Sequence, residues 1–82
     1  MWNLRRNDLD ICADILRVAR RGAKKTHLVY RANLNFSIVK KYIMKLTEGG
    51  FLEAENGRYF TTEGGVRFLE QYEEISSSLF KD

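Results

Sequence analysis

The spacing of apolar residues predicts a helix over residues 7–21 of this 82-residue chain. Its expected core face repeats at intervals of three and four residues and consists of Leu9, Cys12, Leu16 and Ala19. The opposite side is polar and carries Asp10, Asp14, Arg17 and Arg21. Asn7 or Asp8 can cap the start of this helix, and Gly22 is a typical residue at a helix end.

Two more helices are expected after a short connector. Thr26 is a suitable N-cap for a helix that runs through Ala32. The residues Asn33-Leu34-Asn35 interrupt the pattern. Asn35 can then cap a third helix from Phe36 to about Glu48.

The third expected helix has two very different faces. At 100° per residue its inward side consists of Val39, Tyr42, Ile43 and Leu46, with Phe36 at the margin. The outward side consists of Ser37, Lys41, Met44 and Glu48, flanked by Lys40 and Lys45. This helix should therefore pack its apolar back on the core and present ammonium groups to the outside.

The pattern then changes to short alternating runs, "FLEAE" and "RYFTT", joined by Asn56-Gly57. An Asn-Gly pair between such runs is a strong signal for a β-hairpin with a two-residue turn. Thr61 or Thr62 can cap a last helix from Glu63 to about Leu79.

The last helix carries an apolar seam spaced four, three and four residues apart, as in coiled coils. This seam consists of Phe68, Tyr72, Ile75 and Leu79, and Trp2 could cover the same surface. Packing on the domain's own core is expected for Tyr72. For Ile75 and Leu79 a contact between the helices of two copies is an equal alternative, so a homodimer is one expectation.

Composition limits the classes of function. Hydrophobic residues make up 44% of the chain, enough for one compact domain spanning 1–82. We divide it into a core of about 8–62 and a C-terminal helix over 63–80 as a candidate dimerisation element. The sequence contains no apolar run of transmembrane or signal-peptide length, so no membrane association is expected and the expected location is cytoplasmic.

Charge is distributed unevenly along the chain. Residues 1–46 contain eleven Lys and Arg against three Asp, whereas the remaining residues are acidic overall. A basic half of this kind suggests a polyanionic partner for one face.

Catalysis is not expected. The chain has one cysteine, Cys12, and one histidine, His27, on different predicted helices. A glycine-rich phosphate loop after a strand is also missing from the sequence. We therefore expect no enzyme, no metal site and no cofactor.

The predicted fold is mainly α with a small β-hairpin: a winged helix-turn-helix with a three-helix bundle, a two-stranded wing and a C-terminal helix. The segment from Gly22 to Glu70 resembles the small archaeal winged-helix DNA-binding family, which includes transcriptional regulators and dimeric chromatin-type proteins. The similar motifs are "KKT", "ANLN", "YIMKL" and "GRYFTTEGG…FLE". Chromatin-type members dimerise through a much longer final helix than the one expected here.

The resemblance implies binding of double-stranded DNA, with helix 36–48 in the major groove and the wing at 56–58 on the flanking backbone. The implied contact residues are Lys24, Lys25, Thr26, Arg31, Asn35, Ser37, Lys40, Lys41, Lys45 and Arg58. A transcriptional regulator associated with the nucleoid is the leading interpretation. The alternatives are an architectural DNA binder of low sequence specificity and a winged-helix module that binds a protein.

Overall fold

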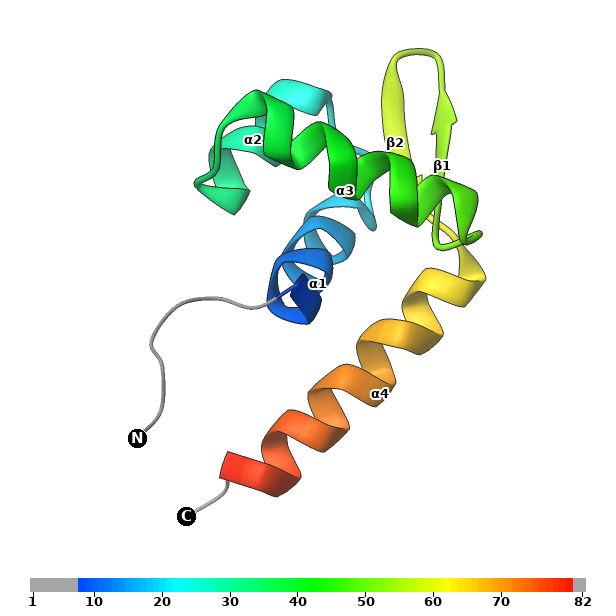
Figure 1. The fold of residues 1–82 in the computed structure, drawn as a ribbon. Coiled ribbons are helices and arrows are strands. Elements are labelled where there is room, and N and C mark those ends of the chain that lie inside the picture. The colour runs from blue at the N-terminus through cyan, green and yellow to red at the C-terminus, as the bar shows by residue number, and fades with distance from the viewer. Residues whose placement is uncertain (1–7, 81–82) are drawn as a thin grey trace.

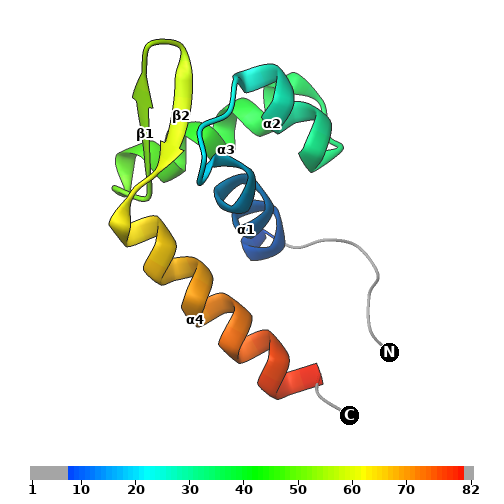
Figure 2. The ribbon, with the colours of Figure 1, turned by 180° about the vertical axis from the view of Figure 1, so that it is seen from behind.

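The computed structural model describes residues 8–80 and confirms the expected order of three helices, a hairpin and a closing helix (Figure 1). The helices are α1 (Asp8–Ala19), α2 (Lys25–Ala32), α3 (Phe36–Glu48) and α4 (Glu63–Phe80). The strands β1 (Leu52–Glu55) and β2 (Arg58–Thr61) form an antiparallel pair between α3 and α4. Figures 1 and 2 show α4 running away from the hairpin along one side of the molecule.

Helix α1 is the centre of the fold, and its packing corrects the expected core face. The side chains of α1 that are buried are Ile11, Ala13, Ile15, Leu16 and Ala19. Leu9 was expected in the core but is 55% exposed, and Cys12 is only half-buried. The reason is tertiary: α2, α3, α4 and β2 all contact α1, so its buried surface extends well beyond one stripe.

The polar face of α1, predicted to lie opposite the core face, contacts α4. The Arg17 guanidinium donates a hydrogen bond of 2.9 Å to Glu73 on α4 and one of 2.8 Å to Asp14. The Tyr72 hydroxyl of α4 donates to the Asp10 carboxylate. Polar residues of α1 therefore help to hold the closing helix in place.

Local signals set most of the helix ends. The Asn35 side chain accepts a hydrogen bond of 2.9 Å from the Ile38 N–H and caps α3, as expected. Thr62 rather than Thr61 caps α4, since its hydroxyl accepts from the Gly65 N–H. The expected cap at Thr26 is wrong: α2 begins two residues earlier than that cap implies, and Lys24 occupies the cap position without a side-chain hydrogen bond.

The hairpin follows the Asn-Gly signal. Asn56 and Gly57 both have positive φ, 52° and 78°, as a two-residue turn of the hairpin type requires. Close to this turn, β2 is bound to the α1–α2 connection, because Ala23 and Tyr59 exchange two backbone hydrogen bonds of 3.0 and 2.8 Å. The Thr61 hydroxyl adds a bond of 2.6 Å to the Leu16 carbonyl.

Candidate nucleic-acid interface

Helix α3 presents the charged face that the sequence predicted. Val39, Ile43 and Leu46 are buried, at 5% exposure or less. Ser37, Lys40, Lys41 and Lys45 are all exposed. Within residues 8–80, none of these three lysines forms an ion pair with a carboxylate, whereas Arg17 and Arg67 do. The ammonium groups of α3 are therefore available to an external anion.

Two hollows border α3 on opposite sides, so that the helix stands out as a ridge. The first, of about 240 Å³, lies between α3 and the start of α1, where Ile38, Lys41 and Lys45 line it. The second, of about 330 Å³, lies between α3 and the hairpin and is lined by Met44, Thr47, Glu48, Ile43, Ala54 and Tyr59. A protruding helix with open space on both sides can enter a groove of matching width.

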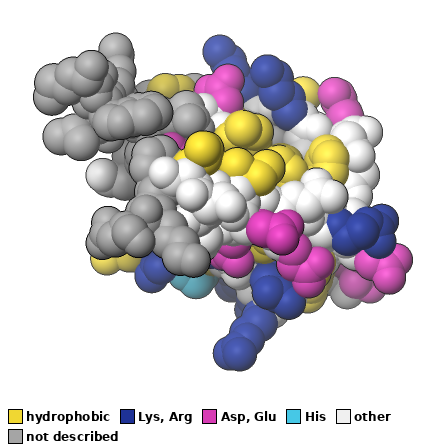
Figure 3. Space-filling view, turned by 90° about the horizontal axis from the view of Figure 1, so that it is seen from below, with side chains coloured by type: hydrophobic (Ala, Val, Ile, Leu, Met, Phe, Trp, Pro, Cys, Tyr) yellow, Lys and Arg dark blue, Asp and Glu magenta, His cyan; other side chains and the backbone are white. Residues whose placement is uncertain are grey.

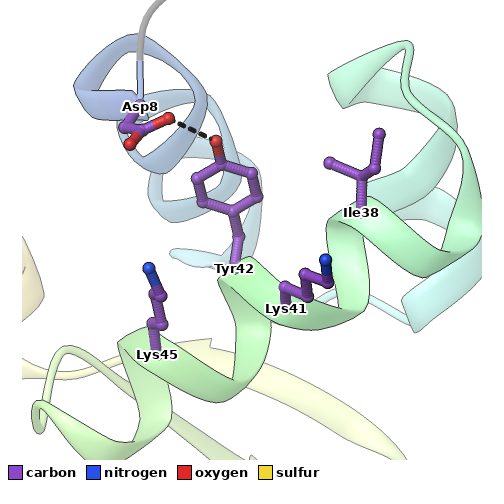
Figure 4. Close-up of a pocket in the computed structure, with 5 residues that line it drawn as sticks. All are labelled: Asp8, Ile38, Lys41, Tyr42 and Lys45. Atoms are coloured by element: carbon purple, nitrogen blue, oxygen red, sulfur yellow. Dashed lines mark hydrogen bonds between the residues drawn. The ribbon is translucent and has the colours of Figure 1, made fainter.

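The first hollow also contains an acid that sequence reasoning missed. In Figure 4 the Asp8 carboxylate faces Tyr42 across the hollow, and the Tyr42 hydroxyl donates a hydrogen bond of 2.6 Å to it. This hydrogen bond is the main reason why the pKa of Tyr42 is raised. Lys41 and Lys45 line the same hollow. One negative charge thus lies beside two of the α3 cations.

The charges around this hollow also affect the pKa of the Cys12 thiol. Burial raises its pKa, the Asp8 carboxylate raises it further, and the Lys45 ammonium opposes both effects. A raised pKa lowers the fraction of reactive thiolate. Cys12 is therefore a half-buried packing residue beside the hollow.

The start of α2 contributes a second group of cations. Lys24 is exposed and Lys25 is half-buried, with its ammonium 4.9 Å from the centre of the Phe36 ring. No acidic residue lies in the first turn of α2, so its N–H groups carry the positive end of the helix dipole without a counter-charge. Thr26 and Arg31 are exposed on the same helix.

The wing contributes less positive charge than the sequence suggested. Arg58 is exposed and follows the hairpin turn directly, as expected. In the strand register, however, it lies opposite Glu55, and Glu53 is also exposed on β1. The position of Arg58 opposite Glu55 could have been found from the sequence by aligning the two runs around Asn56-Gly57.

The expected dimerisation residues divide into two groups. Phe68 and Tyr72 are half-buried against the core, and the Phe68 ring lies 5.8 Å from Phe51 and 6.3 Å from Tyr72. Ile75 and Leu79 are 59% and 70% exposed. Hydrophobic side chains gather near the centre of the face seen from below in Figure 3. Trp2 lies outside the described residues.

Other kinds of site find little support in the part of the chain that the structure describes. Over residues 8–80, no group of three His, Cys, Asp or Glu side chains could hold a metal ion. Among the described helices, none combines the length and apolar character needed to cross a membrane.

Comparison with known proteins agrees with this geometry. The crystal structure of Sso10a-2, a DNA-binding protein from Sulfolobus solfataricus, matches with a TM-score of 0.75 and 30% identity, covering 92% of this chain and 86% of that chain. An uncharacterised protein of Methanocaldococcus jannaschii is 31% identical over 98% of this chain, which spans 38% of that relative's length. The winged helix-turn-helix family model matches residues 5–79. The chain therefore belongs to the winged helix-turn-helix family.

Proposed function

We propose that this chain binds double-stranded DNA by placing α3 in the major groove. The observation that carries this proposal is the ridge formed by α3, whose back is buried and whose front exposes Lys40, Lys41 and Lys45. A helix with its side chains is about 10–12 Å wide, which suits a major groove of about 12 Å. The likeness to Sso10a-2, a DNA-binding protein, supports the same function.

Phosphate contacts would supply most of the affinity. Ammonium groups that neutralise phosphates release condensed counterions, so the binding constant falls steeply with salt concentration. Lys41 and Lys45 suit the backbone on the α1 side of the ridge. Lys24, Lys25 and the start of α2 suit a second stretch of backbone, as helix N-termini bind phosphates well. Arg58 adds one cation on the wing, partly offset by Glu55 in the register.

Base reading would be limited. The Oδ1 atom of Asn35 is used in the α3 cap, so a two-bond contact with adenine, which needs both amide atoms, competes with that cap. Its NH2 group and the exposed Ser37 hydroxyl remain as polar groups near the leading end of α3. We therefore expect modest sequence preference from one copy of the chain.

Transcriptional regulation, in the nucleoid, is the role we propose for this binding. A regulator should enrich a defined site when duplexes are selected from a random pool at two salt concentrations. An architectural binder should retain duplexes without enrichment. A palindrome among the selected sites would indicate two copies bound together.

The Lys40→Ala/Lys41→Ala variant tests the proposed interface. We expect the dissociation constant for a generic duplex to rise tens-fold, and the slope of log affinity against log salt to fall by up to about 2, since each phosphate contact contributes about 0.9. The melting temperature should hold, because both side chains are exposed. Arg67→Ala, which removes a cation from α4, is the control. Parental affinity and slope in the double variant would rule out α3 as the DNA-binding element.

Protein binding is the second candidate function, and the exposed Ile75 and Leu79 of α4 favour it. A protein-binding module should bind duplex DNA very weakly, or with an affinity that depends little on salt concentration. The same titration against ionic strength therefore separates the two functions.

A further inference from the structure

The outward face of α3 carries two large apolar side chains among its lysines. Ile38 is 37% exposed and Met44 is 52% exposed. Phe36, at 48%, is exposed too, but the Lys25 ammonium lies against its ring. Ile38 and Met44 instead line the two hollows beside the ridge, one on each side. Both are thus placed on the surface that the proposed function puts in the groove.

Helix stability does not account for Ile38. At an exposed helical position, isoleucine is a poorer helix former than alanine, lysine or glutamate, because its branched side chain loses rotamer freedom. Neither Ile38 nor Met44 is among the buried residues of the core. The free energy falls when another surface covers exposed apolar groups and removes them from water. Because Lys40, Lys41 and Lys45 surround these apolar groups, the partner that covers them should be a polyanion.

The major groove of DNA offers one apolar group, the C5-methyl of thymine. We propose that Ile38 and Met44 contact thymine methyl groups and give this protein a preference for A·T pairs. This inference rests on the proposed DNA binding and specifies what that surface reads.

The helical geometry fits two such contacts. Residues 38 and 44 are six positions apart, which is about 9 Å along the axis and spans two to three base-pair steps of about 3.4 Å. Around the axis they are about 120° apart, with Lys41 between them. Ile38 therefore faces the α1 side of the groove, and Met44 faces the hairpin side. The ammonium of Lys41 projects between them.

Replacement of thymine by deoxyuracil tests this directly, because it removes the methyl groups and leaves pairing and phosphate charge unchanged. We expect the full chain to bind an A·T-rich duplex more tightly than its deoxyuracil counterpart at the same salt concentration. Burial of one methyl group corresponds to about fourfold in affinity, so two contacts predict about fifteenfold. A G·C duplex carrying 5-methylcytosine should likewise bind more tightly than the unmethylated duplex.

The variants assign the preference to the two side chains. Ile38→Ala/Met44→Ala should bind both duplexes with similar affinity, and Ile38→Val with Met44 intact should show an intermediate ratio. Ile75→Ala, at an exposed apolar site on α4, should keep the full ratio.

Three results would overturn the inference, and they are distinguishable. Equal binding of both duplexes by the parent refutes methyl reading but leaves DNA binding standing. A preference that persists in the double variant assigns it to DNA shape instead. Failure to bind any duplex at low salt refutes the proposed function itself.

Discussion

The Asp8 carboxylate and the Tyr42 hydroxyl, separated by 34 positions in sequence, form a hydrogen bond of 2.6 Å. This bond connects the first residue of α1 to the middle of α3. It also holds a negative charge in the hollow that Lys41 and Lys45 line. If a phosphate approaches these lysines, it also approaches Asp8. The same contact that positions α3 therefore weakens its attraction for an anion.

Asp8→Asn should increase the affinity for DNA. The amide oxygen can still accept the Tyr42 hydrogen bond, while the charge that repels a phosphate is removed. Coulomb energies at this range in water are of order 1 kcal/mol, so we expect about a two- to fivefold gain at low salt and less at higher ionic strength. Titration of a labelled duplex by anisotropy measures it. Glu70→Gln makes the same charge change on α4 and should have a smaller effect; equal gains would show that only net charge matters.

Gly65→Ala should destabilise the fold, although alanine is the better helix former. A Cβ atom at Gly65 would lie 2.3 Å from the Phe51 carbonyl oxygen and 2.5 Å from Thr61 Cγ2. That carbonyl accepts the Thr62 N–H at 3.0 Å, so the start of α4 would have to move. We expect a loss of about 1–3 kcal/mol in the free energy of unfolding, measured by urea denaturation.

Gly64→Ala is the matched control for this position. Its Cβ would meet the nearest atom, the Gly50 carbonyl oxygen, at 3.4 Å, which is ordinary contact. Replacing glycine by alanine in a helix gains up to about 1 kcal/mol, so this variant should be neutral or more stable. Equal destabilisation by both substitutions would show that helix entry, and not the approach of Phe51, requires glycine.

Tyr72→Phe should change how stability depends on pH. The hydrogen bond to Asp10 is the main cause that raises the pKa of Tyr72 above its usual 10.0. A raised pKa in the folded chain means that this bond stabilises the fold below about pH 10 and that its contribution falls as the pH rises through the folded value. Urea unfolding between pH 7 and 11 should therefore show the parent losing its advantage over Tyr72→Phe at high pH.

Tyr30→Phe provides the comparison for this pH series. Tyr30 is 80% exposed, so its replacement should leave stability unchanged across the same range. A constant difference between the parent and Tyr72→Phe from pH 7 to 11 would contradict the role given to the phenol.

Ile75→Glu/Leu79→Glu tests the proposal that two copies meet along α4. These side chains continue the face that Phe68 and Tyr72 place against the core, and charges there should prevent apolar contact between two helices. We expect sedimentation to show a parental dimer and a monomeric variant. Ser77→Glu/Ser78→Glu adds the same charges elsewhere on α4 and should remain dimeric. A parent that is monomeric at high concentration would reject the proposal.

The features that sequence could predict depend on neighbouring residues. Asn35 caps α3 through a bond to an amide three positions ahead, and Asn56-Gly57 makes its own turn. The two faces of α3 follow from its periodicity alone. Each of these features is decided within a few residues of the chain, and each was predicted correctly.

The features that sequence could not predict depend on tertiary packing between elements that are distant in the chain. Leu9 matches the α1 stripe but lies outside the area that other elements cover. The Asp8–Tyr42 and Tyr72–Asp10 bonds join residues far apart in the chain, and no local pattern indicates either pair. The ion pair of Arg17 with Glu73 is of the same kind.

The two backbone hydrogen bonds between Ala23 and Tyr59 have a mechanical consequence. They join β2, close to the turn, to the peptide that links α1 and α2, while β1 packs against α3. The hairpin and α3 should therefore keep a constant spacing. If the chain binds DNA as proposed, duplexes whose groove already fits this spacing should bind without distortion, and duplexes with a narrower groove should bind more weakly.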